Sequence, residues 1–209
     1  VFAEGKKPTG SADPLGVRRA TLGILKTIIQ KDLKVNLTEL IKKSISILPV
    51  KVEAPQKLYE EVKNFFEQRL SIYYNDKYSH DVVEACLSNK DALSDLGDFA
   101  LRLEVVEKIK KLPEFAPVNE AANRIIRIAR ADSNSPDKAL FNSPFETQLM
   151  ECITSINADN LEYEKLFGEL AKAVPVINEF FDNVLVMDKD EKIKENRLKL
   201  LALTKEKFE

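Results

Sequence analysis

Residues 57–76 read KLYEEVKNFFEQRLSIYYND, and large apolar side chains recur in this stretch at the spacing of an α-helix. Plotted around a helix, a set of side chains falls close to one side: Leu58, Val62, Phe65, Phe66, Arg69 and Tyr73. The opposite side carries mainly acidic, basic and amide residues. The stretch therefore predicts a long amphipathic helix whose apolar side packs against other helices.

The same spacing dominates the rest of the chain. Only six glycines, no tryptophan and few alternating runs of β-branched residues argue against sheets. We therefore predict an all-α fold, a multi-helix bundle with short loops between antiparallel neighbours. Further helices are predicted at 12–31 (with Asp13 as N-cap and Pro14 at the first helical position), 36–48, 79–88, 91–112, 118–131, 145–156, 162–174, 175–186 and 191–208.

The polar segment SNKDALSD at 88–95 joins two groups of predicted helices. It suggests a boundary near residue 90, with a smaller helical linker or body region at 1–90 and a helical bundle at 91–209. In the second region, residues 177–187 read INEFFDNVLVM. We expect Phe180 or Phe181 to point into the core, and Val184 and Met187 to continue the buried side.

Composition excludes several classes of protein. The chain has 209 residues, 44% hydrophobic and 32% charged, with a formal net charge of −2 and a pI near 5.7. Disorder is not expected, no apolar run approaches a membrane span, and any RNA binding must come from local patches. Cys86 and Cys152 are interpreted as buried free thiols of a reducing compartment. The N-terminus lacks an initiator Met and a signal peptide, which suggests a piece of a longer polypeptide.

Motifs for catalysis are weak. The segment GKKPTGSADP at 5–14 resembles a phosphate-binding loop but lacks the required Gly-Lys-Ser/Thr. His80 is the single histidine, and it favours a surface or capping role over a triad or metal site. The two cysteines do not have metal-ligand spacing. We therefore expect no catalytic residue, no metal site and no cofactor in this chain.

Two basic clusters are candidates for binding RNA. Arg18 and Arg19 lie in the first turn of the first predicted helix, where the helix dipole disfavours positive charge. Ordinary solvated charge or an ion pair is the alternative interpretation.

The second cluster has arginine at every third position, Arg124, Arg127 and Arg130, with Asn123 beside the first. This spacing makes a slanting stripe on a helix, which can grip phosphates or stack on unpaired bases. A solvated helix face is again the alternative interpretation.

Two longer stretches resemble a known protein family. Residues 5–28, GKKPTGSADPLGVRRATLGILKTI, and residues 180–204, FFDNVLVMDKDEKIKENRLKLLALT, resemble the β subunit of bacterial-type glycyl-tRNA synthetases. Between them, EEVKNFFEQRLSIYY at 60–74 and SHDVVEACLS at 79–88 are similar in order and spacing. The resemblance implies a helical anticodon-binding domain, similar to that of arginyl-tRNA synthetase, at the C-terminal end. It also makes Asn196 and Arg197 candidate contacts with RNA or with a structural partner.

The resemblance implies a role in protein synthesis in the cytoplasm or an organelle. The chain would hold the anticodon arm of glycine tRNA, while a separate α subunit would bind ATP and Mg²⁺ and join glycine to the tRNA. Its expected partners are glycine tRNA, the α subunit and the rest of the β subunit, with no DNA or membrane. The alternative is a non-catalytic helical scaffold that docks the β-subunit body or the α subunit.

Overall fold

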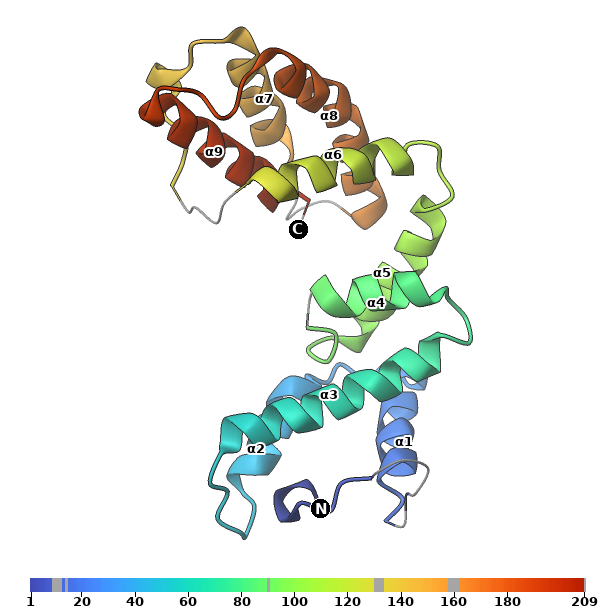
Figure 1. The fold of residues 1–209 in the computed structure, drawn as a ribbon. Coiled ribbons are helices and arrows are strands. Elements are labelled where there is room, and N and C mark those ends of the chain that lie inside the picture. Colours follow the sequence, from blue (N-terminus) through green and yellow to red (C-terminus); the bar gives the residue numbers. More distant parts are fainter. Residues whose placement is uncertain (9–12, 14, 90, 130–133, 158–161, 209) are drawn as a thin grey trace. The chain divides into compact units, whose positions relative to one another are not determined.

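The computed structural model describes residues 1–8, 13, 15–89, 91–129, 134–157 and 162–208. These residues form helices and no strand, so the prediction of an all-α fold is confirmed (Figure 1). The elements in this part of the chain are η1 (Phe2–Glu4), α1 (Val17–Gln30), α2 (Leu37–Ser46), α3 (Pro55–Tyr74), α4 (His80–Asn89), α5 (Leu96–Ile109), α6 (Phe115–Ile128), η2 (Lys138–Leu140), α7 (Pro144–Ser155), α8 (Tyr163–Asn183) and α9 (Glu191–Glu206).

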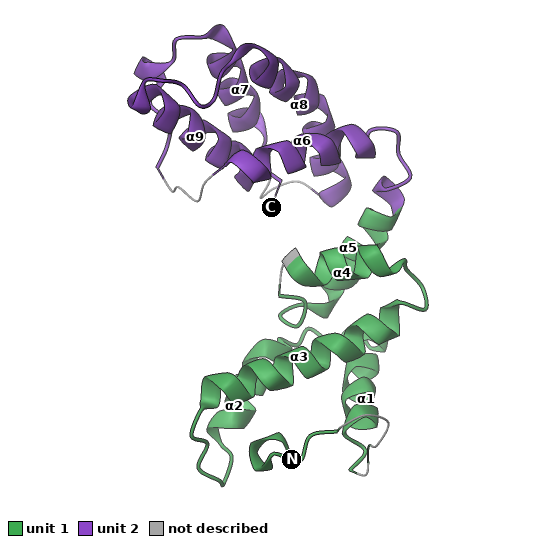
Figure 2. Cartoon of the chain, in the orientation of Figure 1, with its two compact units in different colours: residues 1–107 green, residues 108–209 purple. Residues whose placement is uncertain are grey.

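The chain divides into two compact units, Val1–Glu107 (unit 1) and Lys108–Glu209 (unit 2), coloured separately in Figure 2. The division lies later than the boundary predicted near residue 90. The reason is the packing of α5, whose Phe99 and Leu103 are fully buried in the same core as residues of α1 and α3. The polar segment at 88–95 therefore connects two helices inside unit 1.

Unit 1 is built around α3, the long helix predicted from residues 57–76. Helices α1, α2 and α4 all pack against it. Leu58 and Leu70 of α3 are buried, while Val62 and Phe66 are half-buried at the edge of the core. The buried side of α3 is therefore displaced from the predicted one: Leu58 is the one buried member of the predicted set, and the core also takes Tyr59, Leu70 and Tyr74, each next to a predicted position.

The start of α1 differs in detail from the prediction. The helix begins at Val17, and Gly16 occupies the N-cap position with a φ of 65°, a left-handed conformation that glycine adopts without strain. Asp13 still caps the helix from a distance, because its carboxylate accepts hydrogen bonds from the backbone N–H groups of Val17 (2.8 Å) and Arg18 (3.1 Å). Pro14 lies outside the described residues.

Unit 2 contains α6, α7, α8 and α9 around one hydrophobic core. Helix α8 packs against α7 and α6, and α9 packs against α6 and α7. The largest fully buried side chains at its centre are Ile125, Leu149, Ile153, Ile177, Phe180, Leu200 and Leu201. All four helices contribute to this set, so each depends on the others for its buried surface.

Helix α8 is one continuous helix where the sequence predicts two, at 162–174 and 175–186. Pro175 lies inside it, although proline removes one backbone hydrogen bond and normally costs about 3 kcal/mol in a helix interior. Its neighbours Val174 and Ile177 are buried in the core of unit 2. Tertiary packing on both sides of the proline therefore outweighs the local preference to end the helix.

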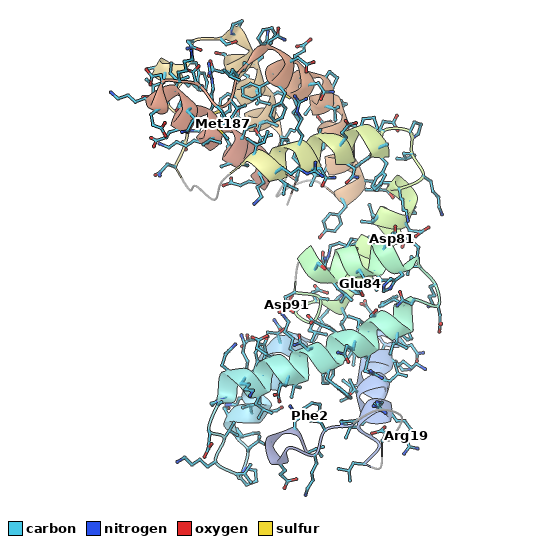
Figure 3. All side chains as sticks on the ribbon, viewed as in Figure 1. Phe2, Arg19, Asp81, Glu84, Asp91 and Met187 are labelled. Atoms are coloured by element: carbon cyan, nitrogen blue, oxygen red, sulfur yellow. The ribbon has the colours of Figure 1, made fainter. Side chains whose placement is uncertain are left out.

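The stretch INEFFDNVLVM contains two adjacent phenylalanines with different environments. Phe180 is fully buried and Phe181 is half-buried, with their rings in an edge-to-face contact at 5.5 Å. Val184 is buried as predicted, although the helix ends one residue earlier. The prediction for Met187 is wrong: the chain has left the helix there, and 51% of the residue is exposed (Figure 3).

Candidate functional site

The predicted arginine stripe lies on α6. Its core side is formed by Val118, Ala121 and Ile125, which leaves Asn123, Arg124 and Arg127 exposed. Asn123 donates a hydrogen bond to the backbone carbonyl of Asn119, one turn earlier (2.8 Å). Arg130 lies outside the described residues. The structure thus places three of the four predicted residues on the exposed side of one helix.

Arg124 is held by α8. The central carbon of its guanidinium lies 4.2 Å from the centroid of the Phe181 ring, which is a cation–π contact. Its Nη1 is 3.9 Å from a carboxylate oxygen of Asp182. The contact joins the α6 stripe to the end of α8 through Phe181 and Asp182.

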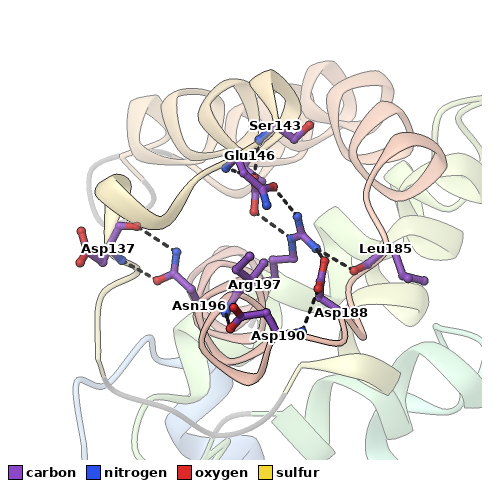
Figure 4. A network of polar contacts seen from close by, with 10 residues as sticks. Asp137, Ser143, Glu146, Leu185, Asp188, Asp190, Asn196 and Arg197 are labelled. Atoms are coloured by element: carbon purple, nitrogen blue, oxygen red, sulfur yellow. Dashed lines mark hydrogen bonds and ion pairs between the residues drawn. The ribbon is translucent and has the colours of Figure 1, made fainter.

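Arg197 of α9 is buried, and its guanidinium donates to four acceptors (Figure 4). Nε donates to Glu146 Oε1 (2.9 Å), and Nη1 donates to the backbone carbonyl of Leu185 (2.9 Å) and to Asp188 Oδ2 (2.7 Å). Nη2 donates to the side-chain oxygen of Asn142 (2.7 Å). The side chain therefore ties the start of α7 and the α8–α9 connection to α9.

Asn196 is buried beside it and makes a two-way contact with one backbone position. Its side-chain oxygen accepts from the N–H of Asp137 (2.7 Å), and its amide nitrogen donates to the carbonyl of the same residue (2.9 Å). This pair of bonds fixes the segment before η2 against α9 (Figure 4).

The contact of Asn196 and Arg197 with RNA stays a prediction, and their burial favours the structural alternative. Both side chains are buried in unit 2, and their hydrogen bonds described above all join protein groups. They act as positioning residues, which hold the loops around α9, and the alternative of a structural contact is the one that the geometry supports.

Glu146 is a structural residue to which the sequence pattern assigned no role. It is fully buried, and its second oxygen accepts from the backbone N–H groups of Asn142 (2.9 Å) and Ser143 (2.8 Å). With Ser143 it forms a capping box at the start of α7. The signal was present in the sequence, because Ser-Pro-Phe-Glu at 143–146 has the Ser-x-x-Glu spacing of this motif.

The turn between α8 and α9 is built from two aspartates. Asp190 caps α9 by accepting from the N–H of Lys192 (2.9 Å), and Asp188 accepts from the N–H of Asp190 (3.0 Å). The N–H of Asp190, and then the guanidinium of Arg197, hold the pKa of Asp188 below its ordinary value of 3.8. The ionised carboxylate is therefore the form that the turn binds.

This pKa shift predicts a pH dependence of stability. A carboxyl whose folded pKa is lowered stabilises the fold above its ordinary pKa and loses that contribution as the pH falls through the folded value. We therefore compare the unfolding free energies of the unmodified chain and Asp188→Asn. Their difference should be constant between about pH 7 and about pH 5, and it should shrink below pH 3.8. Urea unfolding at each pH measures it, and a difference that stays constant to about pH 2 would contradict this account of the turn.

Arg18 and Arg19 lie in unit 1, in the first turn of α1. Arg19, labelled in Figure 3, is exposed, and its guanidinium lies close to Gly16. Arg18 is half-buried, and its backbone N–H donates a hydrogen bond to the Asp13 carboxylate. These two arginines belong to unit 1, whereas the α6 stripe belongs to unit 2.

Among the described residues, no three His, Cys, Asp or Glu side chains lie together as metal ligands would. His80 is exposed at the start of α4. Cys86 is buried as predicted and Cys152 is half-buried, and burial raises the pKa of both thiols, which keeps them protonated at neutral pH. No helix in the described part of the chain is long and apolar enough to span a bilayer.

Comparison with known proteins identifies both units. Residues 1–88 match the family model described as glycyl-tRNA synthetase beta subunit, and residues 118–209 match the model described as DALR anticodon binding domain. Similar curated proteins include the glycine–tRNA ligase beta subunits of Psychromonas ingrahamii (34% identical, 96% of this chain and 30% of the relative) and Proteus mirabilis (34% identical, 100% of this chain and 31% of the relative).

Over almost its whole length the chain is therefore similar to glycyl-tRNA synthetase β subunits. It spans about 30% of the length of the curated β subunits that it matches. The match to the first model lies within unit 1, and the match to the anticodon-binding model covers α7, α8, α9 and most of α6 in unit 2. The α6 stripe and the Arg197 network both lie in the second match.

Proposed function

We propose that unit 2 binds the anticodon arm of glycine tRNA as part of a glycyl-tRNA synthetase β subunit. The observation that carries the proposal is the match of residues 118–209 to an anticodon-binding domain, together with the exposed arginines on the helix that opens this match. In this proposal a separate α subunit binds ATP and Mg²⁺ and ligates glycine, and the enzyme works in the cytoplasm. The chain itself contributes recognition rather than chemistry.

The physical chemistry of the α6 stripe supports this role. RNA is read sequence-specifically at unpaired loops, whose bases stack on aromatic rings or guanidinium planes. Glycine codons begin with GG, so the anticodon ends in CC, and each cytosine presents an amino donor and two acceptors. The Arg124–Phe181–Asp182 group offers a planar cation, a ring and a carboxylate in one place. Such recognition requires few charges, which is compatible with a net charge of −2.

Removing the two arginines should weaken binding in a salt-dependent way. We expect the double variant Arg124→Gln, Arg127→Gln to bind a glycine tRNA anticodon stem-loop about tenfold or more weakly. The slope of log binding constant against log salt concentration should also become shallower, by about one for each phosphate that the variant no longer neutralises. The control is Lys165→Gln with Lys172→Gln, which also removes two exposed positive charges but at least about 14 Å along α8 from Phe181. Equal effects of the two pairs would contradict a site on α6.

A second candidate function has its own observation, in unit 1. A groove of about 400 Å³ lies between η1, α1, α2 and α3 and is lined mostly by apolar residues. Ile24, Leu40 and Leu48 in its lining are 44%, 50% and 39% exposed. An exposed apolar groove of this kind is typical of a surface that another protein segment covers. This unit could therefore serve as the scaffold that docks the rest of the β subunit or the α subunit.

One substitution in the groove distinguishes the docking function from the RNA-binding function. Leu40→Asp should weaken association with the rest of the synthetase and leave the affinity of the chain for the stem-loop unchanged. Leu101→Asp is the matched control, because Leu101 is also 50% exposed but lies on α5, outside the groove lining. If Leu40→Asp and Leu101→Asp affect association equally, the groove is not a docking surface.

A further inference from the structure

The Arg124 guanidinium lies over an aromatic ring of the protein. Phe181 lies under it at 4.2 Å, while 43% of the Arg124 side chain remains exposed. With one face covered by the ring, the guanidinium can present its opposite face and its edges to solvent. A guanidinium supported in this way is a planar surface of the size on which an unpaired base stacks.

The support under this surface is fixed by the core. Ile125, which follows Arg124 on α6, and Phe180, which precedes Phe181 on α8, are both fully buried. The two helices pack directly on each other. Arg124 and Phe181 therefore extend from backbone that the core of unit 2 holds in place, and less side-chain entropy is lost when a ligand stacks there.

Asp182 lies at the edge of the same surface with spare acceptor capacity. Its carboxylate oxygen is 3.9 Å from Arg124 Nη1, which is too long for a hydrogen bond, and its side chain is 70% exposed. A carboxylate is an acceptor only, so it selects a base that presents an amino group at that edge. Cytosine presents its N4 amino group there, whereas uracil presents a carbonyl oxygen.

Resting on the proposed function, we propose that one unpaired cytosine of the glycine anticodon stacks on the outer face of Arg124 and donates its N4 amino group to Asp182. Phe181 acts as a positioning residue, because it contacts the arginine and not the base. Arg127, one turn further along α6 and exposed, contacts the phosphate backbone. The group thus reads one base of the anticodon by stacking and by a single hydrogen bond.

Arg124→Lys tests the stacking, because it keeps the charge and removes the plane. Measured with the 209-residue chain and a glycine tRNA anticodon stem-loop, affinity should fall by about 5- to 150-fold, the range for removal of one stacking partner. Arg127→Lys is the matched control, since it makes the same exchange on the same helix at a residue with no described ring contact. Its affinity should change by less than about twofold. Circular dichroism checks that both variants keep the helical content of the unmodified chain.

Asp182→Asn tests the specificity, because the amide adds a donor at the same place. The unmodified chain should prefer the natural stem-loop over loops with a single C-to-U change in the CC pair by about 5- to 150-fold at one of the two positions. Asp182→Asn should reduce that preference at least about threefold, mainly through better binding of the uracil loop.

The outcomes separate this inference from the proposed function. If the chain prefers the glycine stem-loop to an unrelated one, but Arg124→Lys behaves like Arg127→Lys or Asp182→Asn keeps the full cytosine preference, the stacking site is overturned and anticodon binding stands. If the unmodified chain does not distinguish the two stem-loops, the proposed function and this inference are overturned together.

Discussion

Replacing Arg197 by methionine should destabilise unit 2 by about 3–5 kcal/mol. The substitution removes the four hydrogen bonds of the guanidinium and leaves Glu146, which is fully buried, as an uncompensated carboxylate. A buried charge without its partner costs more than the pair contributes when intact. Hydrogen exchange of the α7–α9 amides in increasing urea measures the effect, and it separates unit 2 from unit 1.

Two further variants separate charge from packing. Adding Glu146→Gln to Arg197→Met should recover a large part of the stability, because the amide oxygen still accepts from the Ser143 N–H and no buried charge remains. Lys192→Met on the exposed side of α9 is the control, with an expected change within about 0.5 kcal/mol. An Arg197→Met variant as stable as Lys192→Met would mean that the network does not hold the unit together.

The two adjacent phenylalanines should respond very differently to truncation. Phe180→Ala is expected to cost about 3–5 kcal/mol, because the ring is fully buried at the centre of unit 2 and its removal leaves a cavity. Phe181→Ala should cost only about 1–2 kcal/mol, from partial burial and the contact with Arg124. The same exchange experiment compares the two variants.

Binding adds a second readout to this pair. Phe181→Leu keeps an apolar side chain but removes the ring under Arg124, so it should weaken stem-loop binding while the α7–α9 amides keep most of their protection. Phe180→Leu is the matched variant. It should clearly lower the hydrogen-exchange protection of the α7–α9 amides, while the molecules that remain folded should bind the stem-loop nearly as well as the unmodified chain. Equal destabilisation at the two positions would contradict the assignment of one ring to the core and the other to the surface.

The helices were predictable because their signal is local. Periodic apolar residues predicted α3 and α9 nearly to their ends, since a helix with one apolar side needs only short-range spacing to be recognised. The unit boundary was not predictable in this way. Whether α5 joins unit 1 depends on the burial of Phe99 and Leu103 against distant helices, which no local pattern encodes. The continuity of α8 through Pro175 likewise depends on packing against distant helices, which no local pattern encodes.

The candidate site was predictable in part. Arginine spacing on a helix identified Arg124 and Arg127 as exposed together, and the structure agrees. The sequence did not reveal that Arg197 is buried. An arginine beside an apolar run gives the same sequence pattern whether it faces solvent or forms buried ion pairs, as Arg197 does with Glu146 and Asp188. Those partners are 51 and 9 residues away along the chain, and only the fold brings them together.

Discrimination between anticodon loops decides whether unit 2 reads the bases of the anticodon. Filter binding compares the 209-residue chain on a glycine tRNA anticodon stem-loop with the same stem-loop carrying GG in place of CC, at one fixed salt concentration. Because both RNAs have the same backbone charge, only recognition of the bases changes. If unit 2 reads the anticodon, the CC loop should bind at least about tenfold more tightly. Equal affinity for the two loops would contradict anticodon recognition and favour the docking scaffold.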